Sequence, residues 1–221
     1  MVTGPPGKPF SDASPGEAPV QGFLHRAALS SGDALILTHG AGNNCRSRLL
    51  VALGGAFAAS GLNVLRCDLP FRQEQYQGPP SLTQAKSDQE GLRRAVAVVK
   101  QKFSGRVFLG GQSYGGFQAS LLAASDPSLV DGLLLLSYPL RPPYAAQIGA
   151  EHLRNLRNPA LFVVGTNRPF GSHEEWEAAV KLIPAPSKLV SIASADVNLL
   201  TNSNRKHLPG EIVVAFRSFF H

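Results

Sequence analysis

The chain has 221 residues, of which 43% are hydrophobic and 16% are charged, and its formal net charge is +6. This composition excludes a wholly disordered protein, and the length favours one domain whose core needs no disulfide bonds. The two cysteines, Cys45 and Cys67, are too few for a disulfide scaffold and do not form a CxxC pair. We therefore expect buried free thiols, no metal and no cofactor.

The distribution of charge and apolar residues disfavours several classes of partner. Like charges do not form blocks of about five, and aromatic residues are not interleaved with basic ones, so a nucleic-acid partner is disfavoured. No apolar run approaches the ~20 residues of a membrane helix. The N-terminus lacks the charged start and apolar core of a signal peptide. We expect a cytoplasmic protein without a membrane partner, and the composition leaves its oligomeric state open.

The first part of the chain differs in composition from the rest. Residues 1–18 are rich in proline, glycine and serine and show no apolar period. Such a segment buries too little surface to offset its ordering entropy, which predicts a flexible tail. Residues 20–28 then suit an antiparallel edge strand, and we expect one domain over 19–221.

Short apolar runs and helical patterns alternate along that domain. The runs are continuously apolar, which predicts strands buried on both faces of a parallel sheet. They lie at Ala34–Thr38, Asn63–Cys67, Arg106–Gly110, Gly132–Ser137, Ala160–Gly165 and Lys188–Ala193. Apolar residues spaced by three and four predict helices over 49–57, 92–103 and 212–219. Strands alternating with helices imply right-handed crossovers and an α/β fold, with a mostly parallel sheet covered by helices on both faces.

The most informative motif is Gly111-Gln112-Ser113-Tyr114-Gly115, which lies between a predicted strand and an apolar helical pattern. G-x-S-x-G in that context is typical of a nucleophile elbow, where the serine occupies a strained turn beyond the carboxyl ends of the strands. The flanking glycines avoid a clash with that turn. Ser113 is therefore the candidate nucleophile. A simple glycine-rich turn is the alternative, and no phosphate-loop pattern can be written here.

A second glycine-rich loop, residues 38–43, follows the first parallel strand. In elbow-containing enzymes this loop supplies one oxyanion donor, so the N–H of Ala41 or Gly42 would act together with that of Tyr114. His39 lies in the same loop but precedes the serine, whereas these enzymes place the catalytic histidine after it. We predict that His39 instead ties its loop through a backbone hydrogen bond.

Four stretches together resemble one family. They are His39-Gly40-Ala41-Gly42, the elbow extended by Gly116, Tyr138-Pro139-Leu140-Arg141-Pro142-Pro143, and Gly165-Thr166-Asn167-Arg168-Pro169-Phe170-Gly171. They resemble the dienelactone-hydrolase-related α/β hydrolases, the group that includes the Tex-type proteins and the hydrolase-like domain of the NSL complex third subunit. The resemblance runs from about Leu35 to the C-terminus. It implies a single-domain α/β-hydrolase fold without a cap domain, and a small ester, thioester or lactone as substrate.

The chain departs from that family at two triad positions. The resemblance implies an acid where this sequence has Arg168 and a histidine where it has Val197. His207 lies later in the same segment and is the candidate replacement base, while Glu174 or Glu175 could replace the acid. Two hypotheses follow: a serine hydrolase with an incomplete triad, or a catalytically inactive binding or interaction module.

Overall fold

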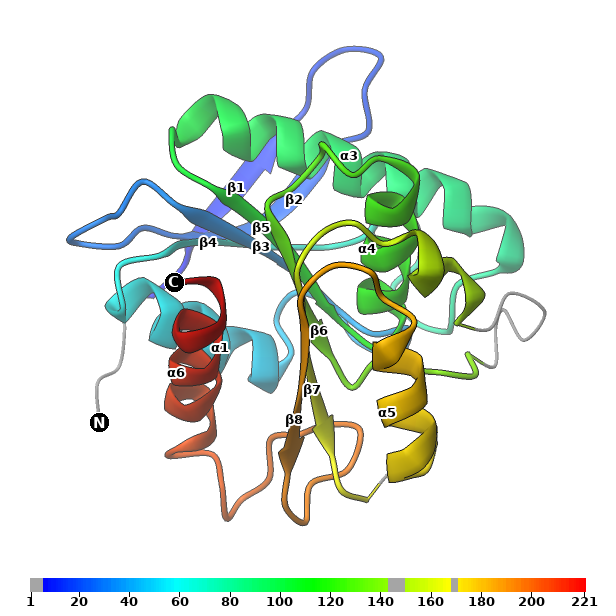
Figure 1. Cartoon of the computed structure of the whole chain (residues 1–221). Helices are drawn as coiled ribbons and strands as arrows, with labels where there is room; N and C mark the ends of the chain where they lie inside the picture. Colours follow the sequence, from blue (N-terminus) through cyan, green and yellow to red (C-terminus); the bar gives the residue numbers. More distant parts are fainter. Residues whose placement is uncertain (1–5, 143–149, 168–170) are drawn as a thin grey trace.

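A single twisted sheet organises the molecule, which we describe from a computed structural model covering residues 6–142, 150–167 and 171–221. In these residues the sheet has eight strands, in the order β1-β2-β4-β3-β5-β6-β7-β8 (Figure 1). The strands are β1 Lys8–Asp12, β2 Val20–His25, β3 Ala34–Thr38, β4 Asn63–Cys67, β5 Val107–Gln112, β6 Gly132–Leu136, β7 Ala160–Gly165 and β8 Ser187–Ile192. The strands from β3 to β8 are parallel, which confirms the predicted α/β class.

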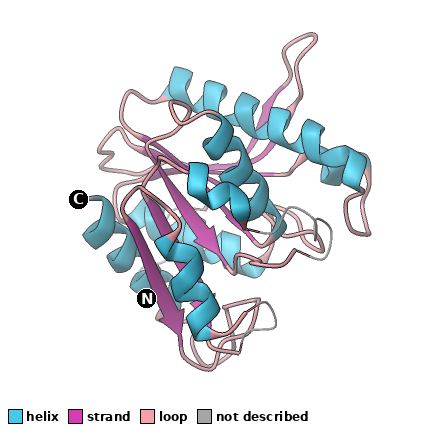
Figure 2. Cartoon of the chain, turned by 45° about the vertical axis from the view of Figure 1, so that its right-hand side comes forward, coloured by secondary structure: helices cyan, strands magenta, loops and turns pink. Residues whose placement is uncertain are grey.

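Helices cover both faces of this sheet (Figures 1 and 2). The α-helices are α1 Arg48–Ala59, α2 Pro70–Glu74, α3 Ala85–Lys102, α4 Tyr114–Ser125, α5 His173–Lys181 and α6 Leu208–Phe220, and the 3₁₀ turns are η1 Leu82–Gln84 and η2 Glu151–Asn155. Two apolar clusters result, one between the sheet and α3, α4 and α5 and the other between the sheet and α1 and α6. We find one domain in the described residues, with no separate cap.

The strand register brings the loops that follow β3, β4 and β5 to one edge of the sheet. Thr38, the last residue of β3, lies opposite Cys67 of β4 and Gly111 of β5. Gln112 of β5 lies opposite Leu136 of β6. The loop that begins at His39 and the turn at Ser113 are therefore neighbours in space. In the sequence, Thr38 and Gly111 are 73 residues apart.

The start of the chain corrects one prediction. Lys8–Asp12 form β1, which pairs antiparallel with β2, so this part of 1–18 is not a flexible tail and β2 is not the edge strand. Arg94 of α3 holds the segment by bonding the Asp12 carboxylate at 2.5 Å and the Ser14 hydroxyl at 2.8 Å. Arg94 lies 82 residues beyond Asp12, so local composition does not reveal this contact.

The lengths and hydropathies of the helices decide whether any of them could span a membrane. None of the helices in the described ranges is both long enough and apolar enough to cross a bilayer. The two cysteines are free and buried, as predicted.

Candidate active site

Ser113 occupies a strained turn between β5 and α4. Its φ and ψ are 48° and −112°, a conformation that non-glycine residues rarely adopt and that is found where a fold holds a functional group in place. The backbone N–H of Ser113 donates to the carbonyl of Leu136 on β6 at 2.8 Å, which ties the turn to the sheet. The side chain is half-buried. This backbone is that of the predicted elbow.

The two glycines that flank the serine are required by this turn. A Cβ on Gly111 would lie 2.5 Å from the backbone of Gly115, and a Cβ on Gly115 would lie 2.6 Å from the carbonyl oxygen of His39. Both distances are far inside van der Waals contact. The elbow therefore closes only because its chain segments approach without side chains between them.

The loop after β3 lies directly against the elbow. A Cβ on Gly40 would stand 3.5 Å from the Cβ of Ser113, and the N–H of Gly115 donates to the carbonyl of His39 at 3.1 Å. Beyond Gly40, the backbone N–H groups of Ala41 and Gly42 donate to no acceptor in the described part of the chain. These donors follow Gly40, which lies against Ser113, in the loop where an oxyanion hole was predicted.

His39 ties this loop, as predicted. Its Nε2 accepts the N–H of Leu69 at 3.1 Å, so Nδ1 carries the proton and donates to the carbonyl of Gly40 at 2.9 Å. The ring is fully buried, and burial lowers its pKa. A neutral imidazole with both nitrogens bonded to backbone has no free nitrogen with which to deprotonate Ser113.

Two charged residues that follow β4 complete the support of the loop. Asp68 accepts the N–H of Cys45 at 2.6 Å and its thiol at 3.2 Å. Burial raises the pKa of the Cys45 thiol to about 12, so that group remains protonated and is not a nucleophile. Arg72, of which only 8% is exposed, is the second support.

Arg72 fastens two loops to each other. Its guanidinium donates to the carbonyls of Ala41 at 2.6 Å and Asn43 at 2.9 Å in the loop after β3. It also donates to the carbonyls of Gln75 at 3.1 Å and Gly78 at 2.8 Å in the loop after α2. Because the guanidinium holds the carbonyl of Ala41, it fixes the orientation of the Ala41–Gly42 peptide group, which carries the N–H of Gly42.

The buried carboxyl group of Asp88 supports the elbow through Tyr114, the residue that follows Ser113. Asp88 on α3 accepts the hydroxyl of Tyr114 at 2.5 Å and the backbone N–H of Phe71 at 2.9 Å. Tyr114 is the first residue of α4, and its ring packs edge-on against Phe71. Burial raises the pKa of Asp88 to about 6, although both hydrogen bonds oppose the shift.

This raised pKa predicts a pH dependence of stability. Because the folded-state pKa lies above the unfolded value, Asp88 contributes most stability below pH ~4 and loses that contribution as the pH rises through about 6. We expect the free energy of unfolding of wild type, relative to that of Asp88→Asn, to be about 1 kcal/mol higher at pH 5 than at pH 7.5. Urea unfolding of both proteins measures it, and equal pH profiles would contradict it. The comparison cancels the opposite contributions of His39 and His152, whose pKa values burial lowers.

The loop after β8 reaches the elbow at Val197. The side-chain amide of Gln112 donates to the carbonyl oxygen of Val197 at 3.0 Å, so residue 197 lies beside the residue that precedes Ser113. Its side chain is half-buried and offers no proton acceptor. Arg168, the other position where the resemblance implies a triad member, lies outside the described residues.

His207 lies in a different environment. It is the N-cap of α6, is exposed, and lines a cavity beside α1 to which Ser113 does not contribute. The hydroxyl of Ser113 makes no hydrogen bond within the described ranges. His152 is likewise occupied elsewhere, since its Nε2 lies 2.8 Å from the Ser120 hydroxyl and 2.9 Å from that of Tyr138, and burial lowers its pKa to about 4.

Sequence reasoning missed the residues that hold the site together. Asp68 and Arg72 follow the end of β4, and Gln112 is the last residue of β5. Polar and charged residues just beyond strand ends are a usable signal for such positions. Asp88 carried no comparable signal, because it lies within a helix far from its partners in the sequence. The described residues also contain no cluster of three or more His, Cys, Asp or Glu side chains suited to a metal ion.

Several solved structures of known proteins share this architecture. An alpha-beta serine hydrolase homologue from Coxiella burnetii has a TM-score of 0.75 and 19% identity, covering 94% of this chain and 96% of that one. A dienelactone hydrolase from Anabaena variabilis has a TM-score of 0.75 and 19% identity, covering 96% and 99%. An α/β serine hydrolase without a lid from Xanthomonas campestris has a TM-score of 0.74 and 14% identity, covering 96% and 94%.

These identities are low, so the three structures establish the fold alone. A family described as an alpha/beta hydrolase domain matches residues 31–209, which include the elbow, the loop after β3 and Val197. The chain therefore belongs to the alpha/beta hydrolase domain family.

Proposed function

We propose that this protein binds small esters, thioesters or lactones at Ser113 and hydrolyses them slowly, as a serine hydrolase with an incomplete triad. The proposal rests on one observation: the backbone of the elbow and of the loop after β3 is formed, but Ser113 has no imidazole bonded to it in the described residues. The elbow and the loop after β3 are in place, and Ala41 and Gly42 present N–H donors without acceptors in the described residues. Within the same residues, the hydroxyl of Ser113 makes no hydrogen bond to an imidazole.

The chemistry follows from these groups. The hydroxyl of Ser113 attacks the substrate carbonyl carbon, and the developing oxyanion accepts hydrogen bonds from the N–H of Tyr114 and that of Ala41 or Gly42. The proton of Ser113 passes to solvent, the alcohol or thiol leaves with a proton from water, and water then hydrolyses the acyl-enzyme. Without a positioned base, turnover falls by several orders of magnitude, leaving the contribution of the oxyanion hole and of binding.

A second candidate function is a binding module without turnover, which is favoured by the lack of an imidazole bonded to Ser113 in the described residues. Gln112 belongs to the same arrangement. Its bond to the carbonyl of Val197 joins the elbow to the segment where the resemblance implies a histidine. If this arrangement is kept for ligand binding alone, the hydroxyl of Ser113 would act as a hydrogen-bonding group and not as a nucleophile.

Initial rates on p-nitrophenyl butyrate distinguish these possibilities. We expect a low wild-type rate that Ser113→Ala reduces to the uncatalysed background, and we expect His207→Ala to leave it unchanged. Equal rates for wild type and Ser113→Ala would favour the binding module. A fast wild type that His207→Ala inactivates would overturn the proposal, because His207 would then be the displaced base.

The finer placement of the chain rests on its motifs. The Tyr-Pro-Leu-Arg-Pro-Pro stretch over 138–143 and the stretch over 165–171 support membership of the dienelactone-hydrolase-related group that includes the Tex-type proteins. A cytoplasmic location and the absence of a nucleic-acid partner remain predictions from composition.

A further inference from the structure

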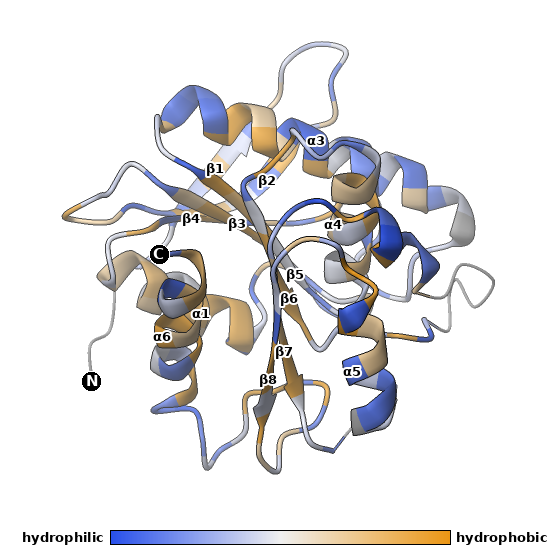
Figure 3. Ribbon diagram, viewed as in Figure 1, coloured by the Kyte–Doolittle hydropathy of each residue, from blue (hydrophilic) through white to orange (hydrophobic). Residues whose placement is uncertain are grey.

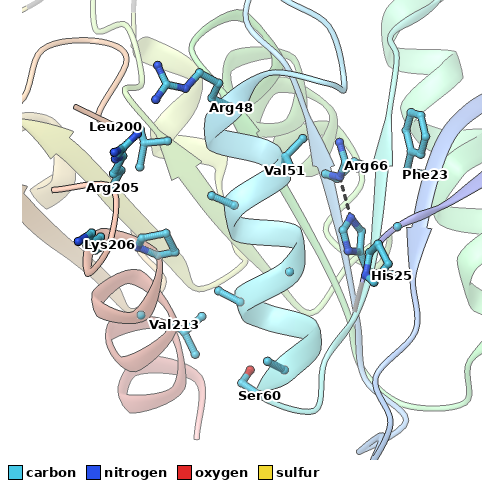
Figure 4. Close-up of a pocket in the computed structure, with 18 of the residues that line it drawn as sticks. Phe23, His25, Arg48, Val51, Ser60, Arg66, Leu200, Arg205, Lys206 and Val213 are labelled. Atoms are coloured by element: carbon cyan, nitrogen blue, oxygen red, sulfur yellow. Dashed lines mark hydrogen bonds between the residues drawn. The ribbon is translucent and has the colours of Figure 1, made fainter. Parts of the chain in front are cut away.

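A large cavity follows the outer face of α1, and Ser113 does not contribute to it. Its volume is about 1310 Å³. Figure 4 shows α1 along the cavity, with α6 on one side and Phe23, His25 and Arg66 on the other. Because the hollow is lined by elements of the sheet face opposite α4, it is independent of the elbow.

The side of α1 that faces this cavity is apolar, although it faces solvent. Beyond Arg48 at its start, α1 contributes Val51, Ala52, Gly55, Ala56 and Ala59, and its C-cap Ser60 follows them. From Leu49 to Ala59 the helix contains no polar side chain, and Figure 3 shows its apolar colouring. Surface helices ordinarily carry polar residues on the outer face. Val213 of α6 and Leu200 add apolar surface across the groove.

One end of the groove between α1 and α6 is strongly basic. Arg48 begins α1, and Arg205 and Lys206 directly precede α6; all three are exposed. Figure 4 shows them at the same end, where both helices begin. The described residues provide no ion-pair partner for any of them, and none of the described residues that line the cavity is acidic. The positive ends of two helix dipoles add to this potential.

We propose that this groove binds a single-chain anionic amphiphile, with its alkyl chain between α1 and α6 and its anionic head group among Arg48, Arg205 and Lys206. An alkyl chain suits the groove because α1 offers no polar side chain between Arg48 and Ser60, whereas an extended peptide would need backbone hydrogen-bond partners there. The eleven residues from Leu49 to Ala59 provide about 16 Å of apolar length. A concave lining suits a discrete molecule better than a flat membrane surface.

Titration calorimetry with monomeric dodecyl phosphate tests this site. We expect one molecule to bind per chain, and we expect inorganic phosphate and dodecylphosphocholine each to bind at least about tenfold more weakly, since one lacks the chain and the other the net charge. Absence of dodecyl phosphate binding, or equal affinity for dodecylphosphocholine, would overturn the proposal. Binding only to phosphatidylglycerol vesicles would also overturn it, in favour of a membrane surface.

Variants locate the binding. Gly210 lines the groove, and a Cβ added there meets nothing within 4 Å, so we expect Gly210→Leu to occupy groove volume and to weaken binding at least about tenfold. Changing Arg48, Arg205 and Lys206 to alanine should do the same, whereas the matched control that changes the exposed Lys86, Lys100 and Lys188 should not. Ser113→Ala should bind like wild type. Loss of binding in Ser113→Ala, or equal loss in the two triple variants, would overturn the proposal without bearing on hydrolysis at Ser113.

Discussion

Changing Val197 to histidine together with Arg168 to aspartate is expected to raise the esterase rate at least about 100-fold above wild type, because an acid and a base act as one unit on the serine. We place the base at Val197 because the resemblance implies a histidine there, and the bond from Gln112 to its carbonyl at 3.0 Å puts residue 197 beside the elbow. The position of the acid comes from the sequence motif. Rates on p-nitrophenyl butyrate for the wild type, both single variants and the double variant measure the effect.

The single variants are the control for that experiment. If Arg168 occupies the acid position that the motif implies, Val197→His alone should restore little, because the cation would disfavour the imidazolium that forms during attack. Arg168→Asp alone provides no base. A double variant no faster than the better single variant would contradict the assignment of these two positions to the triad.

The second large effect is expected at Arg72. Arg72→Ala removes four hydrogen bonds from a cation to backbone carbonyls and should lower the free energy of unfolding by about 4 kcal/mol. Arg72→Lys should recover only part of this, because a single ammonium cannot reach both loops in the way that a guanidinium does. Urea denaturation measures both changes.

The matched control is Arg93→Ala. Arg93 pairs with Asp126 at 2.5 Å, but 41% of its side chain is exposed, so its loss should cost less than about 1 kcal/mol. Hydrogen exchange at Asn43, whose N–H donates to the carbonyl of Gly40 at 3.0 Å, adds a local readout, since Arg72→Ala should speed it and Arg93→Ala should not. Equal destabilisation by the two alanine variants would contradict the role of Arg72.

The parallel strands were predictable because buried strands leave a local signal. The predicted bounds of β3, β4 and β7 coincide with those observed. For β5 the prediction covered Arg106–Gly110 and assigned Gly111 and Gln112 to the motif that follows the strand. The strand continues to Gln112, since Gly111 and Gln112 still pair with Leu135 and Leu136 of β6. Pairing with β6 therefore extends the strand through a residue, Gly111, whose own propensity does not favour a strand.

The site was predictable only in part, for the same reason. Ser113 and His39 lie in short motifs whose residues are adjacent in the sequence, and both adopt the expected local structure. Arg72 and Asp88 act through residues in other elements. Their partners become visible only when β3, β4 and β5 bring their ends to one edge of the sheet.

Fluorophosphonate labelling, mapped to Ser113 by mass spectrometry, tests the central claim most directly. The claim is that an intact elbow presents a serine without an activating imidazole. We expect wild type to label slowly or not at all, and the Val197→His, Arg168→Asp double variant to label faster. Rapid stoichiometric labelling of wild type that Ser113→Ala abolishes would contradict the claim, because it would require a base already in contact with Ser113.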